Sequence, residues 1–272
     1  MLIREILSFI SLGVISFFVL FLCLIPSLVY AIKYVSLSIT DYVPVFLVKL
    51  FYYMLVIVSM NMATFIFIPA LIFRIFRIRP KEGEYDLTPL NRDVYKWYLS
   101  LGLYKISMIV GRVSHITRGL VIRLFGGKIG RNVYFQGHVT EPYFLDVGDY
   151  TVVGDRAKIF THIADKPGRI MFRRVRIGKY CLVGYGALIM PGSKIGDYVI
   201  LGAYSIVPKN SELDNGVWVG SPARKIREIK PEEIQTRKTR VYPFPRSIRQ
   251  KFLPTQEKQK MSSDLHSYEN MQ

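Results

Sequence analysis

The sequence predicts a mainly β protein, in which a parallel β-helix is preceded by two transmembrane α-helices and an amphipathic helical region. Two observations lead to this fold class. Two long apolar stretches without a charged residue lie in the first third of the chain, and an aliphatic residue recurs at every sixth position in the second half. Neither the helical period of 3.6 residues nor the strand period of 2 produces a six-residue spacing.

The two apolar stretches are residues 6–32 and 50–73. Each is long enough to cross an apolar bilayer core of about 30 Å at 1.5 Å per residue. A buried helical hairpin of a soluble protein is the alternative. A cleaved signal peptide is disfavoured, because the first stretch is too long and no A-x-A site follows it. We therefore predict two transmembrane helices within residues 1–81.

The basic residues predict the orientation of these helices. The short connection between them holds Lys33, Asp41 and Lys49, whereas a cluster of cations follows the second stretch: Arg74, Arg77, Arg79 and Lys81. The positive-inside rule places this cluster, and the rest of the chain after it, on the cytoplasmic side of a cell membrane. The two cysteines, Cys23 and Cys181, offer no disulfide framework, which agrees with a reducing compartment.

Residues 82–126 mix aromatic and cationic side chains, such as Trp97, Tyr98 and Arg112, with apolar residues at helical spacing. An amphipathic helix at the headgroup level of the same leaflet suits this composition. A helix packed over the end of the β-helix is the alternative. In either case, we expect this region to link the membrane helices to the repeats.

The six-residue repeat predicts the β-helix directly. Eight aliphatic residues recur without exception: Ile177, Val183, Ile189, Ile195, Leu201, Val207, Leu213 and Val219. Glycine follows five of these eight residues. Three such units make one triangular coil, in which the aliphatic residue points inward and glycine fits where the chain bends with little room for a Cβ. The domain is expected to span residues 127–229. Glu141 and Asp165 occupy inward positions, where a carboxylate must be paired, turn outward or perform a function.

The net charge of +17 raises the question of nucleic acid binding. The excess of cations lies near the membrane helices and in the tail, and there is no finger, recognition-helix or stacking motif. Anionic lipid headgroups are therefore the expected partner of these cations, and no nucleic acid is expected. Residues 230–272 are predicted to be a basic, mobile tail.

The repeat region resembles the hexapeptide-repeat acyltransferases, a left-handed β-helix group that includes galactoside and other sugar O-acetyltransferases. The resemblance covers about a hundred residues and includes the closing segment Val219 to Arg224, which reads VGSPAR. Residues 127–155, with Thr140-Glu141-Pro142, resemble a branch that also forms terminal domains of peptide synthetases. The resemblance implies a left-handed parallel β-helix, a homotrimer with sites at the subunit boundaries, and acetyl-CoA or another acyl-CoA as co-substrate without a metal.

The resemblance also implies a catalytic base, a histidine just before a loop that interrupts the repeats. His162 fills this position, and residues 164–174 are expected to form the loop. Imidazole is suited to remove a proton from an attacking hydroxyl or amine near neutral pH. Glu141, one coil earlier at an inward position, could orient this imidazole or stabilise its charged form. His138 falls where sugar acetyltransferases contact the substrate. A solvated corner, or for Glu141 a loop before Pro142, is the alternative for each.

The resemblance places a second set of residues at the coenzyme: Tyr185, Ala203, Ser205, Lys209, Arg224 and Arg227. Backbone groups at the alanine bind the pantetheine arm in the family, and cations at the last three positions meet coenzyme phosphates. Fixed cations with several donors suit phosphates on physical grounds as well. Leu182 and Tyr185 depart from the residues common at their positions, which leaves the acyl group and the acceptor pocket open.

The function predicted from these residues is a membrane-anchored acyltransferase. It would transfer an acetyl or other acyl group from acyl-CoA to a hydroxyl or amine of an envelope sugar, glycan or lipid-linked intermediate, with His162 as general base. The alternative is a non-catalytic β-helix that serves as a binding or scaffold module at the membrane. A zinc β-helix of the carbonic anhydrase type is disfavoured, because His138 and His162 lack a third histidine.

Overall fold

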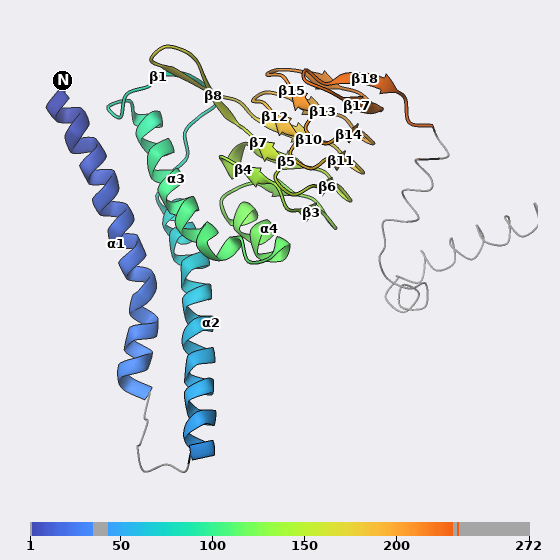
Figure 1. Cartoon of the computed structure of the whole chain (residues 1–272). Helices are drawn as coiled ribbons and strands as arrows, with labels where there is room; N and C mark the ends of the chain where they lie inside the picture. The colour runs from blue at the N-terminus through green and yellow to red at the C-terminus, as the bar shows by residue number, and fades with distance from the viewer. Residues whose placement is uncertain (1, 35–42, 231–232, 234–272) are drawn as a thin grey trace, which may run out of the picture. The chain divides into compact units, whose positions relative to one another are not determined.

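The computed structural model describes residues 2–34, 43–230 and 233. Its first part is a pair of antiparallel helices, α1 (Leu2–Tyr34) and α2 (Val43–Ile75). Both are long and apolar enough to cross a membrane, and many of their large apolar side chains are exposed. The C-terminal half of α1 and the N-terminal half of α2 extend away from α3, α4 and the strands (Figure 1). The two long apolar helices expected from the sequence are thus confirmed as helices.

Two further helices connect this pair to the repeats. Helix α3 (Arg92–Gly111) begins at Asn91, whose side chain caps it, and α4 (His115–Leu124) begins with a capping box formed by Ser114 and Thr117. Helix α3 contacts both long helices, and α4 lies against the first strands of the repeat region (Figure 1). The alternative of a helix packed on the end of the β-helix therefore describes α4, while α3 is largely buried between the two parts.

The repeat region forms a parallel β-helix with three faces. The first face runs in the order β16-β13-β10-β5-β2, the second β18-β17-β14-β11-β6-β3 and the third β15-β12-β7-β4. All pairs within a face are parallel except β17 with β18 at the end. The strands are β2 (Lys128–Ile129), β3 (Tyr134–Phe135), β4 (His138–Val139), β5 (Leu145–Val147), β6 (Val152–Val153), β7 (Lys158–Ile159), β10 (Val175–Ile177), β11 (Leu182–Val183), β12 (Leu188–Ile189), β13 (Lys194–Ile195), β14 (Ile200–Leu201), β15 (Ile206–Val207), β16 (Glu212–Leu213), β17 (Val217–Val219) and β18 (Arg224–Arg227).

The interior of the β-helix is built as the repeat predicts. The aliphatic residues from Ile177 to Leu213 are buried, and only Val219 in the last coil is half-exposed. Glycines stack at the corners because successive coils approach closely there. A Cβ on Gly178, for example, would lie 2.6 Å from the carbonyl of Gly196 in the next coil. The glycines therefore serve close packing of backbone on backbone.

A β-hairpin interrupts the repeats after the second coil. It consists of β8 (His162–Lys166) and β9 (Arg169–Phe172), and β9 also pairs antiparallel with β1 (Gly83–Asp86) from the linker. The sequence predicted a loop over residues 164–174, and in the structure most of this segment is an ordered hairpin. Strand β1 pairs with β9, so that β9 is the central strand of a three-stranded sheet and has backbone hydrogen-bond partners on both sides. Asp165 belongs to β8, and the placement of its side chain lies outside the described residues.

The predicted left-handed β-helix behind two apolar helices is confirmed. The label "mainly β" fits the repeat region only, because α1 to α4 together hold more residues than the short strands. The described residues up to Ile229 form one compact unit. The predicted mobile tail, residues 230–272, lies outside the described residues except for Lys230 and Glu233.

Candidate active site

His162 stands at the point where the third face ends and the hairpin begins. Its side chain is 24% exposed, and its Nδ1 lies 2.9 Å from Oε1 of Glu141, whose side chain is fully buried. Glu141 directly precedes the short 3₁₀ helix η1 (Pro142–Phe144), one coil before His162. The structure thus brings together the two residues that were predicted to act in catalysis, and the inward position of Glu141 is explained by this contact.

Four donors surround the Glu141 carboxylate. Oε1 accepts hydrogen bonds from His162 and from Trp97 Nε1 at 2.8 Å, and Oε2 accepts from the hydroxyls of Thr140 and Thr161, both at 2.5 Å. Burial alone would raise the pKa of Glu141, but the hydrogen bond and charge interaction with His162, followed by the two threonines, outweigh it and lower this pKa. Glu141 is therefore ionised at neutral pH although it is buried.

An ionised Glu141 determines the tautomer of His162. A carboxylate can only accept hydrogen bonds, so Nδ1 of His162 must carry the proton of their shared bond. A neutral imidazole protonated at Nδ1 keeps the lone pair of Nε2 available for a proton. When Nε2 takes a proton, the ring becomes a cation next to a buried carboxylate, which stabilises it. The pair can therefore act as an oriented general base.

Trp97 is the functional neighbour that the sequence analysis missed. The sequence predicted for residues 82–126 a helix at the headgroup level or one packed on the β-helix, and neither prediction gave Trp97 a role in the site. Its indole, from α3, donates to Glu141 and lies edge-on to the imidazole, with 5.0 Å between ring centroids. Trp97 also packs against Phe172 of β9. The one available signal was chemical: a buried carboxylate needs donors, and an indole N–H needs an acceptor.

His138 is exposed at the start of β4 and does not contact the pair. It lines a surface pocket between the first coils and the junction of α3 and α4, and charged side chains gather there: Arg112, Arg118, Asp155 and Arg156. Partial loss of water around the ring, and then the charges of Arg112, Lys158 and Arg118, lower the pKa of His138 against the opposing effect of Glu141. His138 is neutral at neutral pH as a result. We refer to this pocket as the junction pocket.

Three of the predicted coenzyme residues, Tyr185, Ala203 and Ser205, lie between the second and third faces. Tyr185 is exposed there beside Tyr204 and Arg156. Ala203 is exposed one coil later, and within the described part of the chain its backbone N–H has no hydrogen-bond partner. Ser205 differs, because its side chain is buried and accepts from the Gly220 N–H at 3.1 Å. This internal bond disfavours direct contact of Ser205 with a coenzyme.

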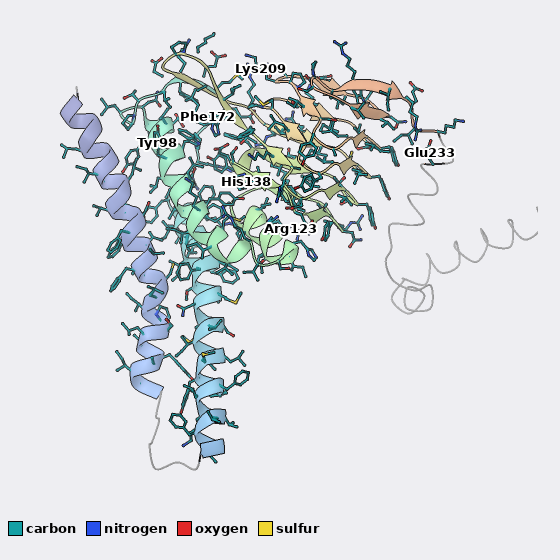
Figure 2. All side chains as sticks on the ribbon, viewed as in Figure 1. Tyr98, Arg123, His138, Phe172, Lys209 and Glu233 are labelled. Atoms are coloured by element: carbon teal, nitrogen blue, oxygen red, sulfur yellow. The ribbon has the colours of Figure 1, made fainter. Side chains whose placement is uncertain are left out.

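The three predicted phosphate-binding cations lie in the last coils. Lys209 follows β15 and is exposed, at the end of the coil stack opposite to His138 and Arg123 (Figure 2). Arg224 and Arg227 begin and end β18, and both are exposed. Arg227 donates to the Glu228 carbonyl at 3.0 Å. The corner with Tyr185 and Ala203 is thus separated from His162 by the width of the third face, whereas Lys209 follows the third face, as His162 does, in a later coil.

Comparison with known families identifies the repeats. Residues 174–209 match the family described as bacterial transferase hexapeptide (six repeats). The protein named "Putative colanic acid biosynthesis acetyltransferase WcaF" of Escherichia coli (strain K12) is 32% identical over 142 residues, which cover 43% of this chain and 78% of that protein.

Two further relatives bear names of the same kind. The galactoside O-acetyltransferase of Escherichia coli (strain K12) is 33% identical over 109 residues, with 37% of this chain and 53% of that protein covered. Among solved structures, a maltose O-acetyltransferase from Clostridium difficile 630 is 25% identical with a TM-score of 0.37. That alignment covers 43% of this chain and 78% of the other.

Proposed function

This chain belongs to the hexapeptide-repeat family of acyl-CoA-dependent acetyltransferases, and from this premise we propose that it is a membrane-anchored enzyme acting on envelope saccharides. It transfers an acetyl or other acyl group from acyl-CoA to a hydroxyl or amine of a sugar, glycan or lipid-linked intermediate. The names of the relatives, a colanic acid biosynthesis acetyltransferase and a galactoside O-acetyltransferase, support a saccharide acceptor. The observation that carries the proposal is the bond between His162 and Glu141.

His162 is the general base of the proposed reaction. Its Nε2 removes the proton from the acceptor hydroxyl or amine while the acceptor atom attacks the thioester carbonyl. The carbon–sulfur bond of the donor then breaks, and His162 returns the proton to the departing sulfur, so that the products are the acylated acceptor and free CoA. Glu141 holds the ring through Nδ1 and stabilises its transient positive charge.

The chain's own residues fit a coenzyme along the corner between the second and third faces. The free N–H of Ala203 suits a pantetheine carbonyl, and exposed Lys209 and Arg224 suit phosphates. This corner and His162 lie at opposite sides of the third face of one chain. A homotrimer, in which a neighbour supplies the second part, resolves this separation.

Helices α1 and α2 are the proposed membrane anchor. Their exposed apolar side chains require a nonaqueous environment, and the cations that follow α2 favour the cytoplasmic side for the β-helix. Acyl-CoA is a cytoplasmic metabolite by its charge and size. The active site would then stand close to the cytoplasmic leaflet, within reach of a lipid-linked acceptor.

The test of the proposed function is CoA release by the full-length protein in detergent, with acetyl-CoA and a panel of nucleotide sugars and saccharides. His162→Ala should lower kcat by roughly 10²–10⁴-fold, the usual contribution of a positioned general base. His115→Ala is the matched control, because His115 is an exposed histidine outside the pair. Equal turnover by His162→Ala and the parent would refute the base assignment. No CoA release with any acceptor would favour the non-catalytic scaffold instead.

A further inference from the structure

The junction of α3 and α4 combines two features that the transfer chemistry does not use. One is the junction pocket, which is lined by Arg112, Arg118, Arg156 and His138. The other is a set of exposed apolar residues on these two helices and the turn between them. We define this set as the junction strip: Ile109, Val113, Ile116 and Leu120, exposed by 59%, 68%, 71% and 37%. A cationic pocket next to an apolar surface suits a ligand with an anionic head and an apolar chain.

The pocket carries an excess of positive charge. Three guanidinium groups and one carboxylate, that of Asp155, line it, and among the described residues none of these arginines has a carboxylate within ion-pair distance. Arg118 is held in place by its hydrogen bonds to the carbonyls of Gln136 and Gly137, and its Nε is buried without a partner. Guanidinium groups fixed in this manner are typical of phosphate recognition.

The strip lies on two helices that contact α2 and on the turn between them. Ile109 lies near the end of α3 and Val113 in the turn that follows, whereas Ile116 and Leu120, four residues apart, lie on one face of α4. Helices α3 and α4 both contact α2, and Arg74 at the end of α2 donates to the carbonyls of Leu124 and Arg123. Exposed apolar side chains that lie beside arginines, on helices in contact with α2, suit the interface of a bilayer.

The distance from the junction pocket to His162 and Glu141 also fits a saccharide head group. Trp97, which donates to Glu141, and Met108, which lines the pocket, are eleven residues apart on α3. At 1.5 Å per residue this is about 16 Å along the helix axis. A diphosphate that carries one or two sugar rings has a comparable length. A head group held in the pocket could therefore present a sugar hydroxyl to His162.

From these observations we propose that the junction pocket and strip form a subsite for a lipid diphosphate, so that the acceptor is a saccharide linked through diphosphate to an apolar lipid. Arg112, Arg118 and Arg156 bind the diphosphate, and the strip contacts the first part of the lipid chain. This inference rests on the proposed function and specifies its acceptor. Arg156 also lies over the ring of Tyr185, a predicted coenzyme residue, so competition with acetyl-CoA is the measurement that distinguishes this ligand from the diphosphate of the coenzyme.

The test is a binding measurement that needs no turnover. The full chain in phosphatidylcholine nanodiscs is titrated calorimetrically with farnesyl diphosphate, farnesol and inorganic diphosphate. Farnesyl diphosphate should bind at least about tenfold more tightly than either fragment, because each fragment lacks one of the two contacts. Arg112→Gln and Arg156→Gln should each weaken its binding about tenfold. Arg131→Gln is the matched control, since Arg131 is an exposed cation of the first coil outside the pocket.

A second variant tests the lipid contact. Val113→Gln combined with Ile116→Gln should weaken farnesyl diphosphate and leave inorganic diphosphate unchanged. Equal affinity of the parent and the Arg112→Gln, Arg156→Gln double variant would overturn the subsite. Competition between acetyl-CoA and farnesyl diphosphate would instead assign the pocket to the acyl donor. A changed oligomeric state of the variant with Val113→Gln and Ile116→Gln would assign the strip to a contact between subunits. His162→Ala should bind farnesyl diphosphate as the parent does, which separates failure of the subsite from failure of the proposed function.

Discussion

Trp97 and His162 donate to the same oxygen, Oε1 of Glu141, at 2.8 and 2.9 Å. The two donors come from different parts of the chain, one from α3, which contacts α1 and α2, and one from the hairpin that interrupts the repeats. Their rings also meet edge to face. The orientation of the imidazole therefore depends on a residue outside the β-helix.

Replacement of Trp97 should reveal a positioning role. Trp97→Phe keeps most of the packing and removes one hydrogen bond to a buried carboxylate, an interaction of about 1.5–3 kcal/mol. We expect kcat to fall by roughly tenfold with an unchanged KM for acetyl-CoA, because Glu141 holds the imidazole less firmly. Steady-state kinetics across the pH range should show that the acidic limb of the kcat profile shifts.

Trp218 supplies the control for this variant, as the only other tryptophan in the sequence. Its Nε1 donates to the Asp214 carbonyl at 3.0 Å, far along the chain from the catalytic pair. Trp218→Phe should therefore leave kcat and the pH profile unchanged. A loss of activity in Trp97→Phe without any shift of the pH profile would indicate a purely structural role.

The stability of the protein should depend on pH through Glu141. Its pKa in the folded state lies below the ordinary value of 4.5, so the unfolded chain binds this proton more readily than the folded one. The corresponding stabilisation is complete above about pH 4.5 and is lost as the pH falls through the lower folded value. Thermal unfolding of Glu141→Gln should show a weaker dependence on pH in this acidic range than that of the parent. Parallel curves for both proteins would contradict the assignment.

The stacked glycines predict a contrast between two substitutions. A Cβ on Gly178 would lie 2.4 Å from Asp197 Oδ1 and 2.6 Å from the Gly196 carbonyl, so Gly178→Ala should destabilise the protein by about 1–3 kcal/mol. A Cβ on Gly119 in α4 would meet no atom within 4 Å. Gly119→Ala should be neutral or stabilise by about 0.5–1 kcal/mol, because alanine favours the helix. Denaturant titration of both variants measures the difference, and equal effects would refute the packing explanation.

Cysteine labelling can determine the orientation in the membrane. Both native cysteines are buried, so a membrane-impermeant maleimide should not react with the parent. Ser38→Cys, in the connection between the helices, should be labelled in intact cells. Arg131→Cys, at a side chain that is 83% exposed, should be labelled only after permeabilisation. The reverse pattern would place the β-helix on the opposite side.

The sequence predicted those parts of the fold that depend on local spacing. The six-residue period identified inward residues such as Ile189 and Val207, which are fully buried, because each unit of a β-helix repeats the same geometry. The same phase identified Glu141 as an inward carboxylate next to the coil of His162. The inward aliphatic residues and the inward position of Glu141 could be predicted because both follow from the spacing of residues within one segment of the chain.

The remaining features depend on contacts between distant segments. Trp97 lies 44 positions before Glu141, and nothing in either segment signals the other. The four residues of β1 contain no run of strand-forming residues, and they form a strand because β9 offers an open edge. The three arginines of the junction pocket likewise come from α3, α4 and a corner of the second coil, which only the packing of these elements brings together.

The shared Glu141 oxygen and the β1 edge have a consequence for how this protein can be divided. A fragment that starts at residue 127 would keep every coil of the β-helix. It would lose the Trp97 indole that donates to Glu141 Oε1 and the strand β1 that pairs with β9. Strand β9 would then have an unpaired edge, one strand away from His162 in β8. The N-terminal segments thus complete the surroundings of His162 in addition to their proposed role as an anchor, and replacing them with an unrelated membrane helix would remove the contacts of Trp97 and β1.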